Sequence, residues 1–297
     1  MRNPPPKRQC LAFALLVCAG AAGVHAAETR YGIDAEWLRD SNLNRAAYSK
    51  EERSDDLFSA EAYAARSRRI SDRSGLVLRG GVRLRAHREF NDLNQLAALG
   101  RVVWRMQPSP GFTRPWFELA GGAEFLRHSD SALRDGYVFS GSVSAGKYFT
   151  DRIRLDAGAG LDQRFGRDGS LYDLSTRHFR LGAEYLATRR VTVYGNVKWL
   201  TGDHVFTAND PGTQSYLIPV SDVIVSDPAF SSAFGGAANV AYRIQADTRL
   251  TEIGVNIPIR GNQALDFGIT TIDSTADGGG GSYDGTLWRA SYLYRFE

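Results

Sequence analysis

The sequence predicts an all-β fold, a transmembrane antiparallel up-and-down β-barrel of about 12 strands, with 14 as the alternative. Three observations predict it. Apolar and polar residues alternate with a period of two through nearly the whole chain, as in strands whose two faces differ. The alternating segments run about 10–14 residues, longer than the roughly 5–6 residues of an average soluble strand and long enough for a tilted membrane strand. Tight turns and longer polar loops alternate along the chain, as they do in transmembrane barrels.

The first element is a secretory signal peptide. The basic start "MRNPPPKR" precedes an apolar run from Cys10 to Val24, and Val24 and Ala26 occupy positions −3 and −1 of a cleavage site. We expect residues 1–26 to be removed after Ala26 and residues 27–297 to form one barrel domain. Both cysteines of the chain, Cys10 and Cys18, lie in the signal peptide, so we expect no disulfide in the mature protein. The segment also carries the whole formal charge of +3, which leaves the mature chain neutral and gives no support to nucleic-acid binding.

Thirteen alternating segments follow the signal peptide. They span residues 30–38, 57–66, 75–87, 95–106, 116–127, 137–148, 152–165, 176–187, 191–201, 233–245, 250–259, 264–273 and 286–296. A barrel with both ends in the periplasm needs an even number of strands. Either one segment is not a separate strand, which gives 12, or residues 216–225 form another, which gives 14. We favour 12, because Pro211, Pro219 and Pro228 interrupt residues 210–230 and central strands avoid proline. Residues 202–231 then form one long loop that is a candidate to fold into the lumen.

The strand over residues 75–87 shows how the two faces are assigned. Its apolar residues, Leu78, Val82 and Leu84 among them, alternate with arginines, so the apolar face meets lipid and the arginines point into the lumen. The same sorting predicts a lumen lined by Arg79, Arg83, Arg85, Arg101, Arg105, Arg152, Arg154, Arg164, Arg180 and Lys198. The inward carboxylates are expected at Asp34, Glu36, Glu118, Glu124, Asp156, Asp162, Glu184, Glu252 and Asp266. Because basic side chains outnumber these acids, a positive field that draws anions is one interpretation, and charges that pair and fill the bore are the other.

The last segment, "TLWRASYLYRFE", places aromatic residues on its apolar face at Trp288, Tyr292, Tyr294 and Phe296. This resembles the C-terminal signature of bacterial outer-membrane β-barrels, which the barrel assembly machinery reads. That signature usually ends on the aromatic residue, whereas Glu297 follows Phe296 here. The resemblance is to a broad class and covers residues 27–297 as a pattern. It implies the outer membrane of a Gram-negative bacterium, with membrane lipids, lipopolysaccharide and the assembly machinery as partners.

The function that fits these features best is a porin-like channel, or an export component, that passes small anionic or acidic solutes through an arginine-lined lumen. A structural or interaction barrel that acts through its extracellular loops is the first alternative. A lipid hydrolase is the second, because His128 adjoins Ser129, Asp130 and Ser131, although this spacing matches no barrel lipase motif. We therefore expect no enzyme. We also expect no metal or cofactor, because no Cys/His cluster is present and the glycine run 278–281 lacks the Lys-Ser/Thr of a phosphate loop.

Overall fold

The computed structural model describes residues 28–167, 170–208, 215, 217–230, 239–279 and 281–296. The expected signal peptide, residues 1–26, and its cleavage after Ala26 lie outside these residues. The strands are β1 Glu28–Asp40, β2 Asp55–Ser71, β3 Ser74–His87, β4 Gln95–Met106, β5 Trp116–His128, β6 Gly136–Tyr148, β7 Ile153–Gly166, β8 Leu174–Leu186, β9 Thr192–Ala208, β10 Val223–Ser226, β11 Val240–Arg260, β12 Gln263–Ala276 and β13 Ser282–Phe296. Short 3-10 turns are η1 Ser49–Glu51, η2 Asn91–Leu93, η3 Ala132–Arg134, η4 Ser170–Tyr172, η5 Ile218–Val220 and η7 Asp277–Gly279. No helix in the described ranges is long and apolar enough to cross a membrane.

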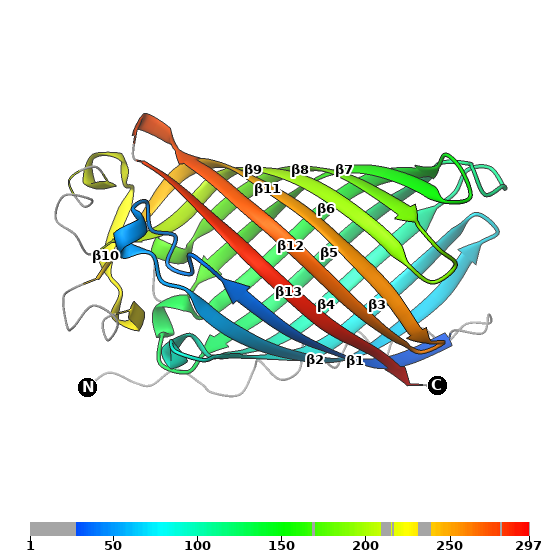
Figure 1. Cartoon of the computed structure of the whole chain (residues 1–297), viewed down its shortest axis with the longest axis horizontal. Coiled ribbons are helices and arrows are strands. Elements are labelled where there is room, and N and C mark those ends of the chain that lie inside the picture. The colour runs from blue at the N-terminus through cyan, green and yellow to red at the C-terminus, as the bar shows by residue number, and fades with distance from the viewer. Residues whose placement is uncertain are drawn as a thin grey trace, which may run out of the picture.

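Twelve long antiparallel strands close into a barrel (Figure 1). Each strand from β1 to β9 pairs with the next, β9 pairs with β11, and β11 to β13 continue the sheet. β13 pairs with β1 from Phe296 opposite Tyr31 to Leu287 opposite Asp40, which closes the ring. Closure satisfies the backbone hydrogen bonds that a free edge would expose to lipid. The prediction of an up-and-down barrel with 12 strands is confirmed.

Two segments that the sequence separates, 233–245 and 250–259, meet in the single strand β11, which begins at Val240. Residues 233–238 of the first segment lie outside the described part of the chain. The apparent break contains Asp247 and Arg249, which point outward, and Arg249 pairs with Asp273 on β12. Both members of this pair are exposed, so they interrupt the apolar face without ending the strand. The expected loop 202–231 also begins later than predicted, because β9 continues to Ala208.

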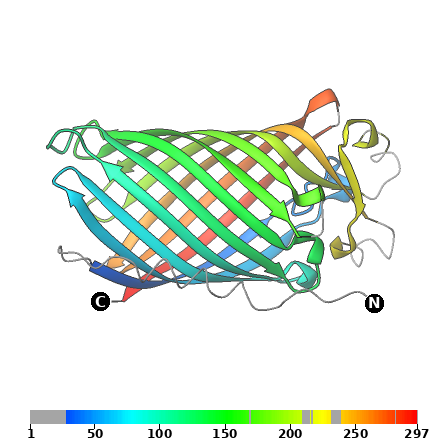
Figure 2. The ribbon, with the colours of Figure 1, turned by 180° about the vertical axis from the view of Figure 1, so that it is seen from behind.

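The barrel has one end with short turns and one end with longer loops (Figures 1 and 2). The turn end joins strands through residues 72–73, 107–115, 149–152, 187–191 and 261–262. Among the described residues, the loop end carries 41–54, 88–94, 129–135, 170–173, 217–230 and 277–279. In outer-membrane barrels the short turns face the periplasm and the long loops face outward, which orients this chain.

Large apolar side chains cover the outer face of the wall. Val143 is 57% exposed, Leu84 58% and Ile253 62%, although these are residues that a soluble protein would bury. Exposed aromatic rings also contact one another between neighbouring strands, as Phe179 and Trp199 do with centroids 5.8 Å apart. An apolar surface of this kind is stable when hydrocarbon replaces water around it.

The main buried core lies at the loop end. There β9 and β11 extend beyond β8 and β12 and pair with each other, while β10 takes the edge of β11 that β12 leaves free. β9 leaves β8 after Gly202, whose φ of +140° and whose Cβ position, 2.2 Å from the Ser175 carbonyl oxygen, both require glycine. Beyond this point a buried cluster fills the inside of the ribbon: Phe206, Ala208, Leu217, Tyr242, Ile244, Ala246, Ile272, Ala276 and Tyr283.

Candidate functional site

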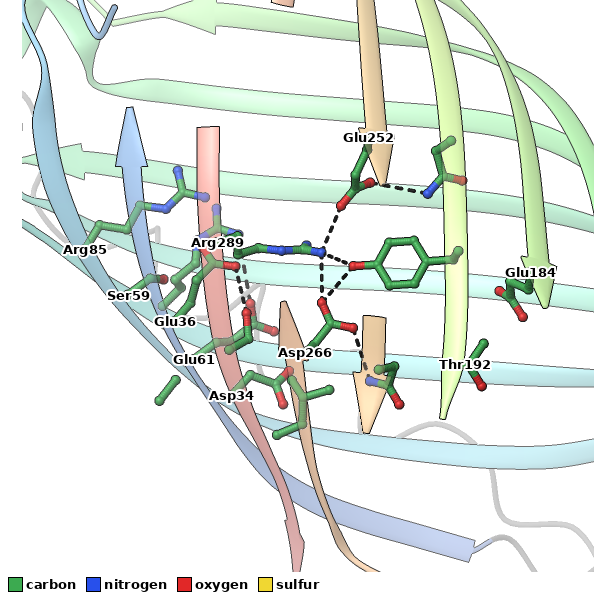
Figure 3. Close-up of a pocket in the computed structure, with 17 residues that line it drawn as sticks. Asp34, Glu36, Ser59, Glu61, Arg85, Glu184, Thr192, Glu252, Asp266 and Arg289 are labelled. Carbon is green, nitrogen blue, oxygen red and sulfur yellow. Dashed lines mark hydrogen bonds and ion pairs between the residues drawn. The ribbon is translucent and has the colours of Figure 1, made fainter. Parts of the chain in front are cut away.

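The inward face of the wall surrounds two cavities at mid-barrel. The first, which we call the acidic cavity, has a volume of about 700 Å³ (Figure 3). Strands β1–β3, β8, β9 and β11–β13 line it, mostly with residues of the polar face. Six carboxylates and three arginines contribute to its lining: Asp34, Glu36, Glu61, Glu184, Glu252 and Asp266 with Arg83, Arg85 and Arg289.

A four-residue network forms one wall of the acidic cavity. Arg289 on β13 donates to Glu252 Oε1 at 2.8 Å and to Asp266 Oδ1 at 2.9 Å, and Figure 3 shows these side chains converging. It also donates to the hydroxyl of Tyr194 at 2.6 Å, and that hydroxyl donates to Asp266 at 2.8 Å. Residues from four strands are thereby fixed around one guanidinium, because Tyr194 lies on β9 and Glu252 on β11. An arginine held in this way is neutralised and adds rigidity rather than a free positive charge.

The second cavity, the serine-lined cavity, has a volume of about 560 Å³ and is lined by β2 to β9. Small side chains make its wall, with Ser140, Ser142 and Ser144 on β6 beside Gly122 and Gly158. It shares Glu61 and Arg83 with the acidic cavity. Its further charged groups are three carboxylates and four basic side chains: Glu118, Glu124 and Asp162 with Arg79, Arg101, Arg180 and Lys198.

Taken together, the two cavities are lined by nine carboxylates and seven basic side chains. The basic excess expected from the sequence is therefore absent along these cavities. The charges are distributed unevenly, since acids dominate the first cavity and basic groups slightly outnumber acids in the second.

The structure pairs most of the predicted lumen arginines with carboxylates on other strands. Arg79 on β3 contacts Asp34 at 3.0 Å and Glu61 at 2.6 Å, and its guanidinium stacks 3.6 Å from the ring centre of Tyr63. Arg83 contacts Glu124 on β5 at 2.7 Å. The acids therefore come from the strands on either side of the arginine-rich pair β3–β4.

The pairing continues around the wall. Arg105 contacts Glu118 at 2.7 Å, and Arg154 contacts Glu184 at 2.6 Å. Arg180 contacts the buried Asp156 at 2.7 Å. Lys198 lies 3.9 Å from Asp162, at the outer limit of an ion pair.

Two of the predicted arginines that line these cavities make no side-chain ion pair or hydrogen bond in the described part of the chain. Arg101 faces the serine-lined cavity opposite Arg79, and it is exposed to that space. Arg85 is half-buried and lines the acidic cavity, and its Nε is buried without a partner. Among the described residues that line these two cavities, Arg101 and Arg85 are the arginines without an ion pair.

The remaining two predicted residues lie away from the two cavities. Arg152 lies in the turn before β7, exposed at the turn end, where its carbonyl accepts from the Leu186 N–H. Its position extends the alternation by one step beyond the strand, which is why the sequence assigned it to the wall. Arg164 is at the loop end of β7, 4.6 Å from the ring centre of Tyr172, and donates to the Arg134 carbonyl.

A third cavity, the capped chamber, lies under the loops with a volume of about 290 Å³. Its cap is the segment Asp227–Phe230 of the long loop. Asp227 is fully buried and accepts two hydrogen bonds from the guanidinium of Arg134 in η3, one of them at 2.8 Å. Phe230 lines the chamber and meets Phe90 edge-on, with ring centroids 5.1 Å apart. Burial raises the pKa of the nearby Tyr172 hydroxyl, which stays neutral beside Arg134.

His128 forms part of the chamber wall. Its Nε2 lies 3.0 Å from Gln95 Nε2 and its Nδ1 lies 3.5 Å from Asp135. The imidazole is thus held between an amide and a carboxylate.

Three features of the bore and its cap were missed at the sequence level. Glu61 joins both cavities but was not assigned inward, although Ser59, Glu61 and Tyr63 repeat with a period of two. Tyr194 was not among the predicted site residues. The pair Arg134–Asp227 joins two loops 93 positions apart, and loops carry no periodicity from which it could be read.

The residues of the C-terminal signature lie on β13, which closes the barrel between β12 and β1. Trp288, Tyr292 and Phe296 are exposed on the outer face, and the rings of Tyr294 and Phe296 meet edge-on at 4.9 Å. Recognition by the assembly machinery stays a prediction.

The sequence matches no family model, and no curated protein matches it. Its structure is similar to an outer membrane channel from Pseudomonas putida F1, with a TM-score of 0.56, 8% identity, and coverage of 90% of this chain and 96% of that chain. Other similar structures are the CymD monoaromatic hydrocarbon channel (TM-score 0.47, 9% identity, 91% and 88% covered) and the NanC porin (TM-score 0.44, 8% identity, 88% and 98% covered). The first similarity shows that this chain has the fold of a Gram-negative outer-membrane β-barrel.

Proposed function

We propose that this outer-membrane barrel is a porin-like channel for small solutes, and that small anionic solutes cross it along the serine-lined cavity. The observation that carries the proposal is a bore that is hollow at mid-barrel. A barrel of about eight strands is filled by its own side chains, whereas these 12 strands enclose cavities of about 700 and 560 Å³. Volumes of this size accept a molecule of ordinary metabolite dimensions.

The anion route follows from where the charges are left uncompensated. In the serine-lined cavity Arg101 is exposed and makes no ion pair in the described residues, and Lys198 is only at the limit of one. Small serine and glycine side chains leave the space next to these cations open. In the acidic cavity the arginine of the Arg289 network is neutralised by its carboxylates, so that side repels anions. The small-residue sector is therefore the favourable path.

The cap over the chamber at the loop end favours one alternative function, a barrel that acts through its extracellular loops. Because the Asp227–Phe230 segment covers the chamber at the loop end, a closed barrel that acts through its extracellular loops also agrees with the geometry. Conduction separates the two functions. We propose transport rather than catalysis because the similar structure with a TM-score of 0.56 is an outer membrane channel.

The experiment is the conductance and reversal potential of the refolded protein in a planar bilayer under a salt gradient. We expect discrete current steps and a reversal potential on the anion side. Arg101→Gln, which removes the free cation without breaking an ion pair, should move the reversal potential toward zero. A folded barrel that carries no current would favour the loop-acting alternative, and a cation-selective current would refute the anion route.

A further inference from the structure

One arginine of the capped chamber makes no ion pair with the chamber walls. Arg85 on β3 lines this chamber as well as the acidic cavity, so the two spaces adjoin at its side chain. Its Nε is buried without a hydrogen-bond partner, and its guanidinium makes no ion pair among the described residues. Arg85 is half-buried, and Glu36 and Glu61 share the lining of the acidic cavity with it without forming an ion pair to it. A partly desolvated arginine whose donors are not all used is a suitable site for an anion from outside the chain.

The other ionic groups of the chamber are already paired. Arg45 contacts Asp40 at 2.8 Å, and His87 contacts Asp55 at 3.1 Å. Arg134 is held by Asp227, a residue outside the chamber lining. Within the described ranges, Arg85 is therefore the one arginine of the lining that makes no ion pair.

A second unpartnered atom lies beside Arg85. Gln95 on β4 is directly opposite it in the strand register and also lines the chamber. The Gln95 amide nitrogen is used by His128, whereas its Oε1 is buried without a partner. A donor and an acceptor on adjacent strands are thus both unused and face the same space.

The chamber is small, and besides the polar residues Asn44, Thr207 and Tyr172 the rest of its lining is apolar. Leu38, Leu57, Leu93 and Phe230 line it. Its volume of about 290 Å³ equals the space of about ten water molecules at roughly 30 Å³ each, which suits one ring or a short chain.

We propose that the capped chamber is a binding site for a small monocarboxylate with an apolar body, whose carboxylate pairs with Arg85. The apolar part of the ligand packs on the leucines and Phe230, and a hydroxyl on the ligand would donate to Gln95 Oε1. A planar guanidinium suits a carboxylate because two parallel N–H groups can bond its two oxygens. This site goes beyond the proposed channel, since a barrel that binds such a ligand need not conduct.

The test is isothermal titration calorimetry on the refolded protein in detergent micelles, with empty micelles as the blank. The probes are benzoate, its neutral analogue benzyl alcohol, and inorganic phosphate. We expect saturable binding of benzoate, and affinities at least tenfold weaker for benzyl alcohol, which lacks the charge, and for phosphate, which lacks the apolar body. Equal binding of benzoate and benzyl alcohol, or preference for phosphate, would overturn the proposal.

Variants then locate the site. Arg85→Gln should lower the affinity for benzoate at least tenfold, whereas the matched control Arg152→Gln, which removes an exposed arginine at the turn end outside all three cavities, should leave it within twofold. Unchanged binding by Arg85→Gln would overturn the assignment. If that variant does not show the heat-modifiable migration of a folded barrel, Arg85→Lys keeps the charge, and the probe series on the unmodified protein still decides. Failure of conduction with retained benzoate binding would reject the channel and keep this site.

Discussion

We expect the buried ion pair between Arg134 and Asp227 to hold the cap, residues Asp227–Phe230, in its closed position. Asp227 is fully buried and the Arg134 side chain is 10% exposed, so each charge depends on the other. Asp227→Asn leaves the guanidinium in a buried site that Arg164 also approaches, since Arg164 donates to the Arg134 carbonyl. Removing one member of a buried pair costs about 3–5 kcal/mol, because the remaining charge is uncompensated.

We expect this loss to shift the equilibrium between the closed and the open cap and to leave the fold of the barrel wall unchanged. At about 1.4 kcal/mol for each factor of ten, the loss corresponds to a change of about 10²–10⁴ in the ratio of closed to open cap. No barrel strand contains either residue, so the folded barrel and its heat-modifiable migration should be retained. Single-channel recording should show Asp227→Asn with a higher open probability than the unmodified protein.

Two further variants make the reasoning testable. Asp222→Asn changes an exposed carboxylate of the same loop and should leave the recordings unchanged. The double variant Arg134→Met with Asp227→Leu replaces the pair by apolar groups, which is often neutral or stabilising, and should restore the closed cap. Recordings of Asp227→Asn that match the unmodified protein would refute the idea that this pair holds the mouth shut.

Three other predictions concern the wall. Arg101→Glu reverses the free charge of the serine-lined cavity, and we expect a cation-selective reversal potential; continued anion selectivity would contradict the proposed route. Val143→Arg puts a cation at the centre of β6 on the lipid face, at a cost of about 2–4 kcal/mol, so folding into lipid vesicles should be impaired. The control Ser142→Arg puts the same charge on the inward face and should fold. Equal folding yields of the two variants would show that the faces are misassigned. Arg289→Met leaves Glu252 and Asp266 without their ion pair, so the temperature at which the barrel loses its heat-modifiable migration should fall. Because the Arg289 side chain is 31% exposed, we expect the free energy of unfolding to drop by about 1–3 kcal/mol. An unchanged temperature would mean that the network adds no stability.

The architecture could be predicted from the sequence because lipid imposes one rule on every strand. Each residue that faces hydrocarbon is apolar, and its neighbours along the strand are free to be polar, so the period of two is strong in β3, β6 and β7. The prolines of the long loop indicated the strand number correctly, although the short strand β10 forms between Pro219 and Pro228 and pairs with β11 without joining the closed ring. The division of β11 failed where the rule stops, because Asp247 and Arg249 lie on the outer face among exposed, charged neighbours.

The partners of the lumen charges could not be predicted in the same way. Arg79 meets Asp34 two strands away, and that contact depends on the curvature of the wall rather than on any local pattern. The inward position of Glu61 was missed because Ala60, Ala62 and Ala64 form the outer face of β2. Alanine is only weakly apolar, so the alternation along this strand is faint. The cap was beyond reach, because Arg134 and Asp227 lie in loops that only the closed barrel brings together.

The continuity of β11 limits how the mouth can move. One unbroken strand carries Glu252 of the Arg289 network and Tyr242 of the buried cluster at the loop end. A slip of one residue against β9 would turn every inward side chain toward lipid, and a slip of two would displace each charge pair along the bore. The pairing register of β11 against β9 is therefore fixed, and β11 cannot slide along β9 in small steps. Opening has to come from a hinge near Gly202 or from release of the Asp227–Phe230 segment, while the strands themselves stay in register.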